Sequence, residues 1–307
     1  MKILVTGAAG FIASHVADRY IEAGHDVVIV DNLSTGKRRN VPARACLHVI
    51  DINDPSVADL VEQEKPDVIN HHAAQIDVRR SVADPIHDVK TNVEGTLRLA
   101  MAGLTCGTRR FIFASTGGAI YGEQDVFPAT ETHPTNPLSP YGVSKLASEK
   151  YLATLAHNNG LEVVCLRYSN VYGPRQSPDG EAGVVAIFAK SLLAGRSAII
   201  NGDGLQTRDF VHVGDVAAAN LLALTTEKPA TYNIGTGVET TILDIYRILA
   251  ASAGHRQAEI HASEKRGEQR RSCIDASKAK KLLGWTSKTS LVDGLTETLE
   301  SFRSTLP

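Results

Sequence analysis

Short apolar runs alternate with amphipathic stretches through the first half of the chain. The runs have the length of strands, and the stretches between them repeat apolar positions every three or four residues, as helices do. Such an alternation is typical of a parallel sheet wound with helices. The predicted strands are residues 2–6, 26–30, 47–50, 67–70, 110–114 and 162–167, and the predicted helices are residues 11–23, 55–64, 87–104 and 141–157.

The regular pattern loosens after about residue 168, where loops rich in Gly and Pro precede a smaller mixed region. A helix that begins near residue 215 and a strand over residues 231–234 are expected to rejoin the large sheet. We therefore predict two domains. The first spans residues 1–167 plus about 213–236, and the second, which is expected to bind the substrate, spans residues 168–212 plus 237–307.

Composition and charge mainly exclude classes of partner and location. Of the 307 residues 43% are hydrophobic, which is enough for a sizeable core, and a formal net charge of -2 gives no reason to expect nucleic acid or an anionic membrane as partner. No apolar stretch is long enough to span a bilayer. Four cysteines, at positions 46, 106, 165 and 273, lack metal-ligand or redox-pair spacing. We expect a cytoplasmic protein with a small substrate.

A glycine-rich turn follows the first predicted strand and opens the first predicted helix. Gly7 and Gly10 let the backbone approach a pyrophosphate, and the helix N-terminus supplies free N–H groups. Asp31 ends the second strand, where its carboxylate can bind adenosine ribose hydroxyls and would repel a 2′-phosphate. The basic residues 37–39 are the alternative signal, for NADP. We predict a Rossmann-type doubly wound sheet that binds NAD.

Tyr141 and Lys145 lie four residues apart in a predicted helix, which places a phenol beside an ammonium group. A neighbouring cation favours the phenolate, so the pair is a candidate base for taking a proton from an alcohol. The alternative is that Tyr141 and Lys145 are an ordinary exposed pair on a helix surface. The residues at the ends of the predicted strands favour the catalytic interpretation.

Polar residues mark two further strand ends. His71 and His72 precede small residues that would let a planar ring lie close to the backbone, and adjacent residues of a strand point to opposite faces, so metal binding is not expected. Ser115 and Thr116 place two hydroxyls at the mouth of the sheet. Either could share a hydrogen bond with the substrate oxygen that Tyr141 deprotonates.

These motifs, with residues 166–170 and 206–210, resemble the extended short-chain dehydrogenase/reductases that act on nucleotide sugars, and most of all the UDP-glucose 4-epimerase family. The resemblance covers nearly the whole chain. It implies that Tyr141 is the base, that Lys145 holds the nicotinamide ribose and lowers the Tyr141 pKa, and that Thr116 orients the sugar hydroxyl. Ser115 is the second candidate for that last role.

The resemblance also implies two sets of binding residues. The NAD contacts are Gly7, Gly10, Phe11, Ile12, Asp31, Asn32, Ser34, Thr35, Gly36, Asp51, Ile52, His72, Ala73, Ala74, Gln75, Asn92, Ser115, Tyr141, Lys145 and Tyr168. The UDP-sugar contacts are Thr116, Asn170, Gly183, Val184, Asn201, Gln206, Arg208, Lys265 and Glu268. Two positions depart from the family pattern: Ala13 replaces the third glycine of the turn, and Lys265, next to Arg266, replaces a phosphate-binding arginine.

The implied reaction is NAD-dependent inversion at C4 of a UDP-hexose, UDP-galactose to UDP-glucose, through a transient 4-keto sugar, as in galactose metabolism. The related dehydratases carry an acidic pair after Thr116, whereas this chain has Gly117, Gly118 and Ala119, so elimination lacks its acid. A UDP-glucuronate 4-epimerase or another nucleotide-sugar epimerase remains open. A noncatalytic NAD-binding sensor is the alternative of a different class, and it would not need Tyr141, Lys145 and Thr116 together.

Two further expectations come from the same resemblance. A small residue, Ser272, stands at the position that limits the pocket near the sugar's C2 substituent, which suggests that N-acetylated sugars fit. The helical stripes of residues 87–104 and 141–157 resemble the helix pair of a four-helix interface, so we expect a homodimer. The stripe residues are Val89, Val93, Leu97 and Ala100, and Leu146, Tyr151, Leu152 and Leu155.

Overall fold

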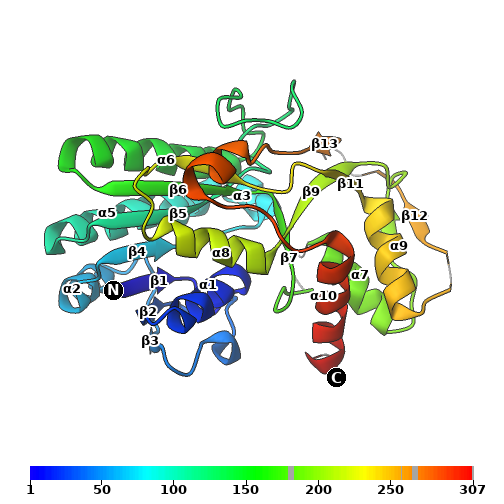
Figure 1. The fold of residues 1–307 in the computed structure, drawn as a ribbon, viewed down its shortest axis with the longest axis horizontal. Coiled ribbons are helices and arrows are strands. Elements are labelled where there is room, and N and C mark those ends of the chain that lie inside the picture. Colours follow the sequence, from blue (N-terminus) through cyan, green and yellow to red (C-terminus); the bar gives the residue numbers. More distant parts are fainter. Residues whose placement is uncertain (179–182, 257, 265–268, 306–307) are drawn as a thin grey trace.

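A seven-stranded parallel sheet forms the larger part of the computed structural model, of which residues 1–178, 183–256, 258–264 and 269–305 are described (Figure 1). The strand order is β10-β6-β5-β4-β1-β2-β3, and the order reverses beside β1, as in a doubly wound sheet. The strands are β1 (Lys2–Thr6), β2 (Asp26–Val30), β3 (Cys46–His48), β4 (Val68–His71), β5 (Arg110–Thr116), β6 (Glu162–Tyr168) and β10 (Thr231–Ile234).

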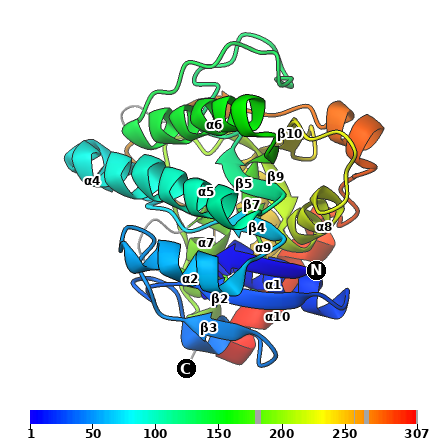
Figure 2. The ribbon, with the colours of Figure 1, turned by 90° about the vertical axis from the view of Figure 1, so that its left-hand side faces the viewer.

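Helices cover both faces of this sheet (Figure 2). One face carries α1 (Phe11–Glu22) and α8 (Val213–Ala223), and the other carries α2 (Ser56–Glu64), α5 (Gly95–Cys106) and α6 (Pro140–Asn159). The central strands are buried on both faces: Ile3, Leu4 and Val5 of β1 have no exposed surface. This two-sided burial explains why the strands are continuous apolar runs in the sequence.

The remaining elements form a smaller mixed region. Strands β7 (Asn170–Tyr172), β9 (Thr207–His212), β11 (Glu239–Thr241) and β13 (Arg271–Ser272) make one sheet, and β8 (Ile199–Asn201) pairs with β12 (Ile260–Ala262). A second core, which includes Phe188, Tyr246 and Leu299, lies between α7 (Val184–Leu193), α9 (Ile242–Ala253) and α10 (Leu291–Thr305). The predicted fold class is confirmed.

Most predicted elements lie within about two residues of the observed bounds, and two of the differences bear on the description of the fold. The third strand is shorter and earlier than residues 47–50, because Val49 and Ile50 lie beyond its pairing with β2. The helix expected over residues 87–104 runs from Pro85 to Cys106 in three parts: α4 (Pro85–Val89), a π-helical turn η2 (Lys90–Glu94) and α5. Such single π turns often occur at functional sites, and this one contains Asn92.

Short elements complete the fold. They are α3 (Val78–Ala83), the 3-10 turn η1 (Arg38–Asn40) and the π turn η3 (Ala279–Leu283). None of the helices within the described ranges is both long and apolar enough to cross a membrane.

Candidate active site

The glycine turn between β1 and α1 presses against the end of β4. Gly7 has φ +75°, a conformation that L side chains rarely adopt, and a Cβ there would lie 2.7 Å from the Ala73 nitrogen. Gly10 caps the N-terminus of α1 without a side-chain hydrogen bond. The first N–H groups of this twelve-residue helix are therefore left for a ligand, and they face the carboxyl edge of the sheet. Phe11 and Ile12, both half-buried, begin the helix.

Asp31 at the end of β2 is buried and organises the neighbouring loop. Its two carboxylate oxygens accept hydrogen bonds from the Ala9 and Leu33 backbone nitrogens at 2.9 and 2.8 Å. The Asn32 amide donates to Asp51 at 2.8 Å, which brings two predicted cofactor residues together beside Asp31. Ser34 and Thr35 are exposed, Gly36 packs against Ala9 and Asp31, and Ile52 is buried. Lys37, Arg38 and Arg39 have exposed side chains.

The loop after β4 is fixed by neutral histidines. His71 is within hydrogen-bond distance of the Thr6 and Thr96 hydroxyls, at 2.7 and 2.9 Å. His72 points elsewhere: its ring stacks on Tyr168, with 3.1 Å between Nε2 and the phenol oxygen. Burial lowers the pKa of both imidazoles, that of His72 to about 3. The described residues hold no cluster of metal ligands.

Small side chains continue this loop. The Ala73 nitrogen donates to Thr6 at 3.1 Å, Ala74 is half-buried and Gln75 is buried. Asn92, from the π turn η2, donates to the Gln75 carbonyl oxygen and accepts from the Gln75 nitrogen, at 2.9 and 2.8 Å. Two residues predicted to bind the cofactor thus brace one another across the loop.

Tyr141 and Lys145 lie in the first turns of α6, which the Ser139 hydroxyl caps and Pro140 begins. Lys145 is buried, and its ammonium donates to the Ala114 carbonyl oxygen at 2.9 Å while lying over the Phe113 ring. Burial lowers the pKa of Lys145 to about 8. Within the described chain no group hydrogen-bonds the half-buried Tyr141 phenol.

The surroundings raise the pKa of Tyr141, because they desolvate the phenolate and because the Asp88 carboxylate repels it. The expected lowering by Lys145 is therefore not found. The Lys145 ammonium is bound to the Ala114 carbonyl oxygen, and the effects that act on the phenol, desolvation and the Asp88 charge, both raise its pKa.

Ser115 and Thr116 have different environments. The Ser115 hydroxyl is buried and donates to Glu149 at 2.5 Å. Glu149 also pairs with Arg167 at 2.6 Å, so Ser115 belongs to a buried ionic network. Thr116 is half-exposed, and its hydroxyl accepts a hydrogen bond from the Ala119 nitrogen at 3.2 Å. Of the two hydroxyls, that of Thr116 is free to meet a ligand.

The second region brings several predicted substrate residues near this point. A Cβ on Gly118 would lie 3.5 Å from the Asn170 amide oxygen and 3.9 Å from the Thr116 hydroxyl, so Gly118 lies between these two residues. Gly183 caps α7 and Val184 begins it. Lys265 and Glu268 lie outside the described residues.

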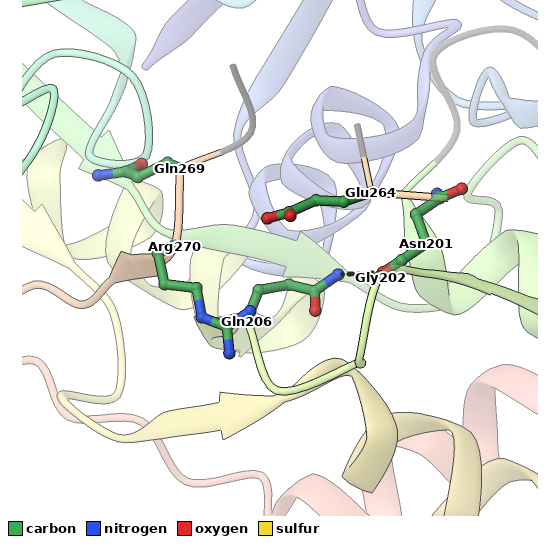
Figure 3. A pocket seen from close by; sticks show the side chains of 6 residues that line it. All are labelled: Asn201, Gly202, Gln206, Glu264, Gln269 and Arg270. Atoms are coloured by element: carbon green, nitrogen blue, oxygen red, sulfur yellow. Dashed lines mark hydrogen bonds between the residues drawn. The ribbon is translucent and has the colours of Figure 1, made fainter. Parts of the chain in front are cut away.

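Asn201 and Gln206 line a small polar pocket in the C-terminal region (Figure 3). The Gln206 amide nitrogen donates to the Asn201 carbonyl oxygen at 3.0 Å, whereas its buried oxygen lacks a partner among the described residues. Glu264, Gln269 and Arg270 line the same pocket. Arg208, on the neighbouring strand β9, donates to the Thr207 carbonyl oxygen at 2.7 Å.

Four polar residues of the site were missed by sequence reasoning. Glu149 could have been found, since it follows Lys145 by four residues on the same helix. Arg167 lies within one of the segments that carry the resemblance, but its partner was not identified. Asp88 and Asn220, which donates to the Tyr168 phenol at 2.9 Å, carry no signal in the sequence.

The glycine turn between β1 and α1 and the buried Asp31 after β2 define a dinucleotide-binding protein, and Tyr141 and Lys145 on α6 are its candidate proton-transfer residues. A sequence profile of the NAD dependent epimerase/dehydratase family matches residues 3–235. The chain belongs to this family.

Individual relatives resemble the whole chain. The UDP-glucose 4-epimerase of Mycolicibacterium smegmatis is 42% identical over 313 residues, which is 99% of each chain. The crystal structure of UDP-glucose 4-epimerase with UDP-glucose from Thermotoga maritima matches with a TM-score of 0.98 and 46% identity over the full length of both chains. That of the Thermus thermophilus UDP-glucose 4-epimerase in complex with NAD matches with a TM-score of 0.94 and 41% identity, again over both full chains.

Proposed function

We propose that the protein is a nucleotide-sugar 4-epimerase that interconverts UDP-galactose and UDP-glucose with bound NAD. The observation that carries this assignment is a Tyr141 phenol without a hydrogen-bond partner among the described residues, one helical turn before the buried Lys145 ammonium on α6. Thr116 ends β5, and residues 117–119 after it include no acidic residue. The named epimerases that match over the full chain support the same conclusion.

The residues present fit a dinucleotide. Any Cβ at Gly7 would fill the space beside the glycine turn, and the N-terminus of α1 has no side-chain cap. The buried Nδ1 of His72 lacks a hydrogen-bond partner among the described residues. Gly7, Gly10 and the start of α1 would hold the pyrophosphate, while Asp31 and Asn32 would hold the adenosine ribose. When bound, NAD accepts a hydride from the sugar and returns it.

The chain's own residues move the proton. Tyr141 takes the proton of the C4 hydroxyl as the sugar is oxidised and gives it back to the 4-keto oxygen. Lys145 supplies the positive charge that the phenolate needs, and Thr116 orients the same oxygen. The nucleotide is expected to be gripped by Asn170, Gln206 and Arg208, between the large sheet and the small ones, while the ketone turns to present its other face.

Purified protein, without added NAD, should convert UDP-galactose to UDP-glucose, as resolved by chromatography. Tyr141→Phe should lower kcat by about 10²–10⁴ without loss of folding, because the base alone is removed. Tyr151→Phe, on the outer part of the same helix, is the matched control and should retain activity. Conversion of UDP-glucuronate alone would move the assignment to a uronate epimerase, and turnover of neither sugar with NAD added would refute it.

Substrate breadth depends on Ser272. This residue is 4% exposed, so it is not the solvent-facing serine that a surface strand would give. It lies on β13 opposite Arg208 of β9, a predicted substrate residue. Because a serine leaves more room than any larger polar residue there, we infer that nucleotides of N-acetylated hexosamines also enter the pocket.

We also infer a homodimer and a cytoplasmic location. Large hydrophobic side chains are exposed along α4, α5 and α6: Ile86 at 78%, Val89 at 48%, Met101 at 59%, Val143 at 51% and Tyr151 at 52%. Other stripe residues, such as Ala100 and Leu152, are buried against the sheet. The exposed set fits an isologous interface with a second copy. All four cysteines are free, as in a reducing compartment.

A further inference from the structure

Asp88 is a fully buried carboxylate on α4, the short helix that packs against α6. One of its oxygens, Oδ1, accepts hydrogen bonds from the Gln75 and Asn92 side-chain amides, each at 3.0 Å. Gln75 and Asn92 are joined directly to one another as well. Asp88 therefore anchors the loop that follows β4, which carries His72, Ala73 and Gln75, residues expected to contact NAD.

The other oxygen, Oδ2, is buried without a hydrogen-bond partner among the described residues. A buried carboxylate is costly unless a nearby cation compensates for its charge. The Lys145 ammonium is attracted by Asp88, and among the described residues its hydrogen bond is to a neutral group, the Ala114 carbonyl oxygen. Asp88 and Lys145 are thus complementary buried charges on helices that pack together.

The other ionisable groups that act on Lys145 do not compensate for its positive charge. Glu149, from α6, also attracts the ammonium, but both of its oxygens are bound by Arg167. His71, the last residue of β4, and His72, which follows it, are neutral because burial lowers their pKa values. Asp88 is accordingly the negative charge near the pair that no arginine neutralises within the described chain.

Two opposed effects set the charge of Lys145. Burial lowers the pKa of its ammonium to about 8, while Asp88 and Glu149 raise it. The same Asp88 charge raises the pKa of the Tyr141 phenol. Lys145 and Tyr141 therefore both keep their protons to a higher pH when Asp88 is charged than they would if residue 88 were neutral.

We propose that Asp88 is a positioning residue of the reaction: its buried carboxylate, on the helix that packs against α6, favours the protonated forms of both Lys145 and Tyr141 and so sets the pH range over which Tyr141 exchanges its proton. This inference rests on the proposed function of the same site. It assigns to α4 an electrostatic role besides bracing the loop after β4.

Asp88→Asn keeps the shape and the Oδ1 acceptor but removes the charge. Lys145 would then lose its proton at lower pH, and Tyr141 would as well, so both limbs of the profile of kcat/KM against pH should move down by about one pH unit. Asp88→Glu, which restores the charge, should move the profile back toward that of the unmodified protein. A purely structural role would lower kcat/KM at every pH and leave both limbs in place.

Asp84→Asn is the matched control. Asp84 caps the same helix, is exposed, and would keep its amide oxygen as acceptor for the His87 nitrogen. Its pH profile should not change. If Asp88→Asn fails to fold, Asp88→Ser is neutral and smaller, and it should give the same shift. A folded neutral variant with an unshifted profile would overturn the proposal.

A second measurement separates this inference from the proposed function. The ¹³C NMR titration of the Lys145 side chain, assigned with Lys145→Arg, needs no substrate. Its midpoint should lie near pH 8 in the unmodified protein and lower in the neutral Asp88 variant. Absence of sugar turnover would refute the epimerase assignment, but the titration would still test whether Asp88 acts on the charge of Lys145. An unchanged midpoint would overturn the role of Asp88 whatever the activity.

Discussion

At the level of single side chains, the site contains two kinds of polar group: those that are bonded within the protein and those that are available to a ligand. Ser115 is committed to Glu149, whereas Thr116 keeps a half-exposed hydroxyl. Lys145 is anchored to Ala114, whereas the Tyr141 phenol has no hydrogen-bond partner within the described chain. Under the proposed function, the breadth of substrates depends on the size of residues near the sugar, and Ser272 is the residue that we propose for this role.

Ser272→Tyr should lower kcat/KM for UDP-N-acetylgalactosamine at least tenfold relative to UDP-galactose. A phenol at this buried position would occupy the space proposed for the N-acetyl group. Ser272→Ala, which leaves the pocket open, is the control and should preserve the ratio. Steady-state rates on both nucleotides measure the effect. Equal inactivity of the unmodified protein and Ser272→Tyr on the N-acetylated sugar would remove the basis for this role.

Among the elements, the turn from β1 to α1 has the strictest steric requirement. Gly7→Ala should reduce NAD affinity at least tenfold and destabilise the fold by about 1–2 kcal/mol or more, because its Cβ would press on Ala73 in a left-handed conformation. Retained NAD, measured after denaturation of the purified protein, and thermal unfolding report the two effects.

Gly160→Ala is the control for backbone strain. Gly160 ends α6 with φ +71° and has no atom within 4 Å of its would-be Cβ. This variant should lose a similar amount of stability from strain but bind NAD normally. Equal NAD binding by the Gly7 and Gly160 variants would show that the turn does not carry the cofactor.

For the whole molecule, the proposed dimer interface is the exposed hydrophobic face on α4, α5 and α6. The protein should be a dimer by light scattering at micromolar concentration, and Ile86→Asp should shift it toward monomer, because a charge would be buried at the interface. Leu222→Asp, on α8 at the opposite face of the sheet, is the control and should remain dimeric. A monomeric unmodified protein would contradict the interface.

The sequence predicted the centre of the large sheet well because strands such as β1 and β4 are buried and read as continuous apolar runs, whereas the edge strand β3 is only partly buried and was predicted less accurately. The bounds of β10 and α2 fall within a residue of those expected. The sequence could not show the π turn around Asn92, since the spacing of apolar residues there matches that of an ordinary α-helix. Nor could it show the contact of Ser115 with Glu149, which joins residues 34 positions apart, or the contact of Asp88 with Gln75, which depends on how the loop after β4 folds onto α4.

The electrostatics of the Tyr141–Lys145 pair also needed the structure. Spacing alone predicts that the ammonium lowers the pKa of the phenol. Burial reverses that expectation by desolvating the phenolate and the ammonium together, and only the folded chain shows how deeply each group lies.

The central claim is that the hydrogen removed from C4 of the sugar returns to the same carbon. UDP-galactose carrying deuterium at C4 tests this directly, with the label in the product located by NMR and mass spectrometry. The account predicts UDP-glucose with deuterium retained at C4. Loss of the label to water, or its appearance at C6 as in an elimination, would contradict it.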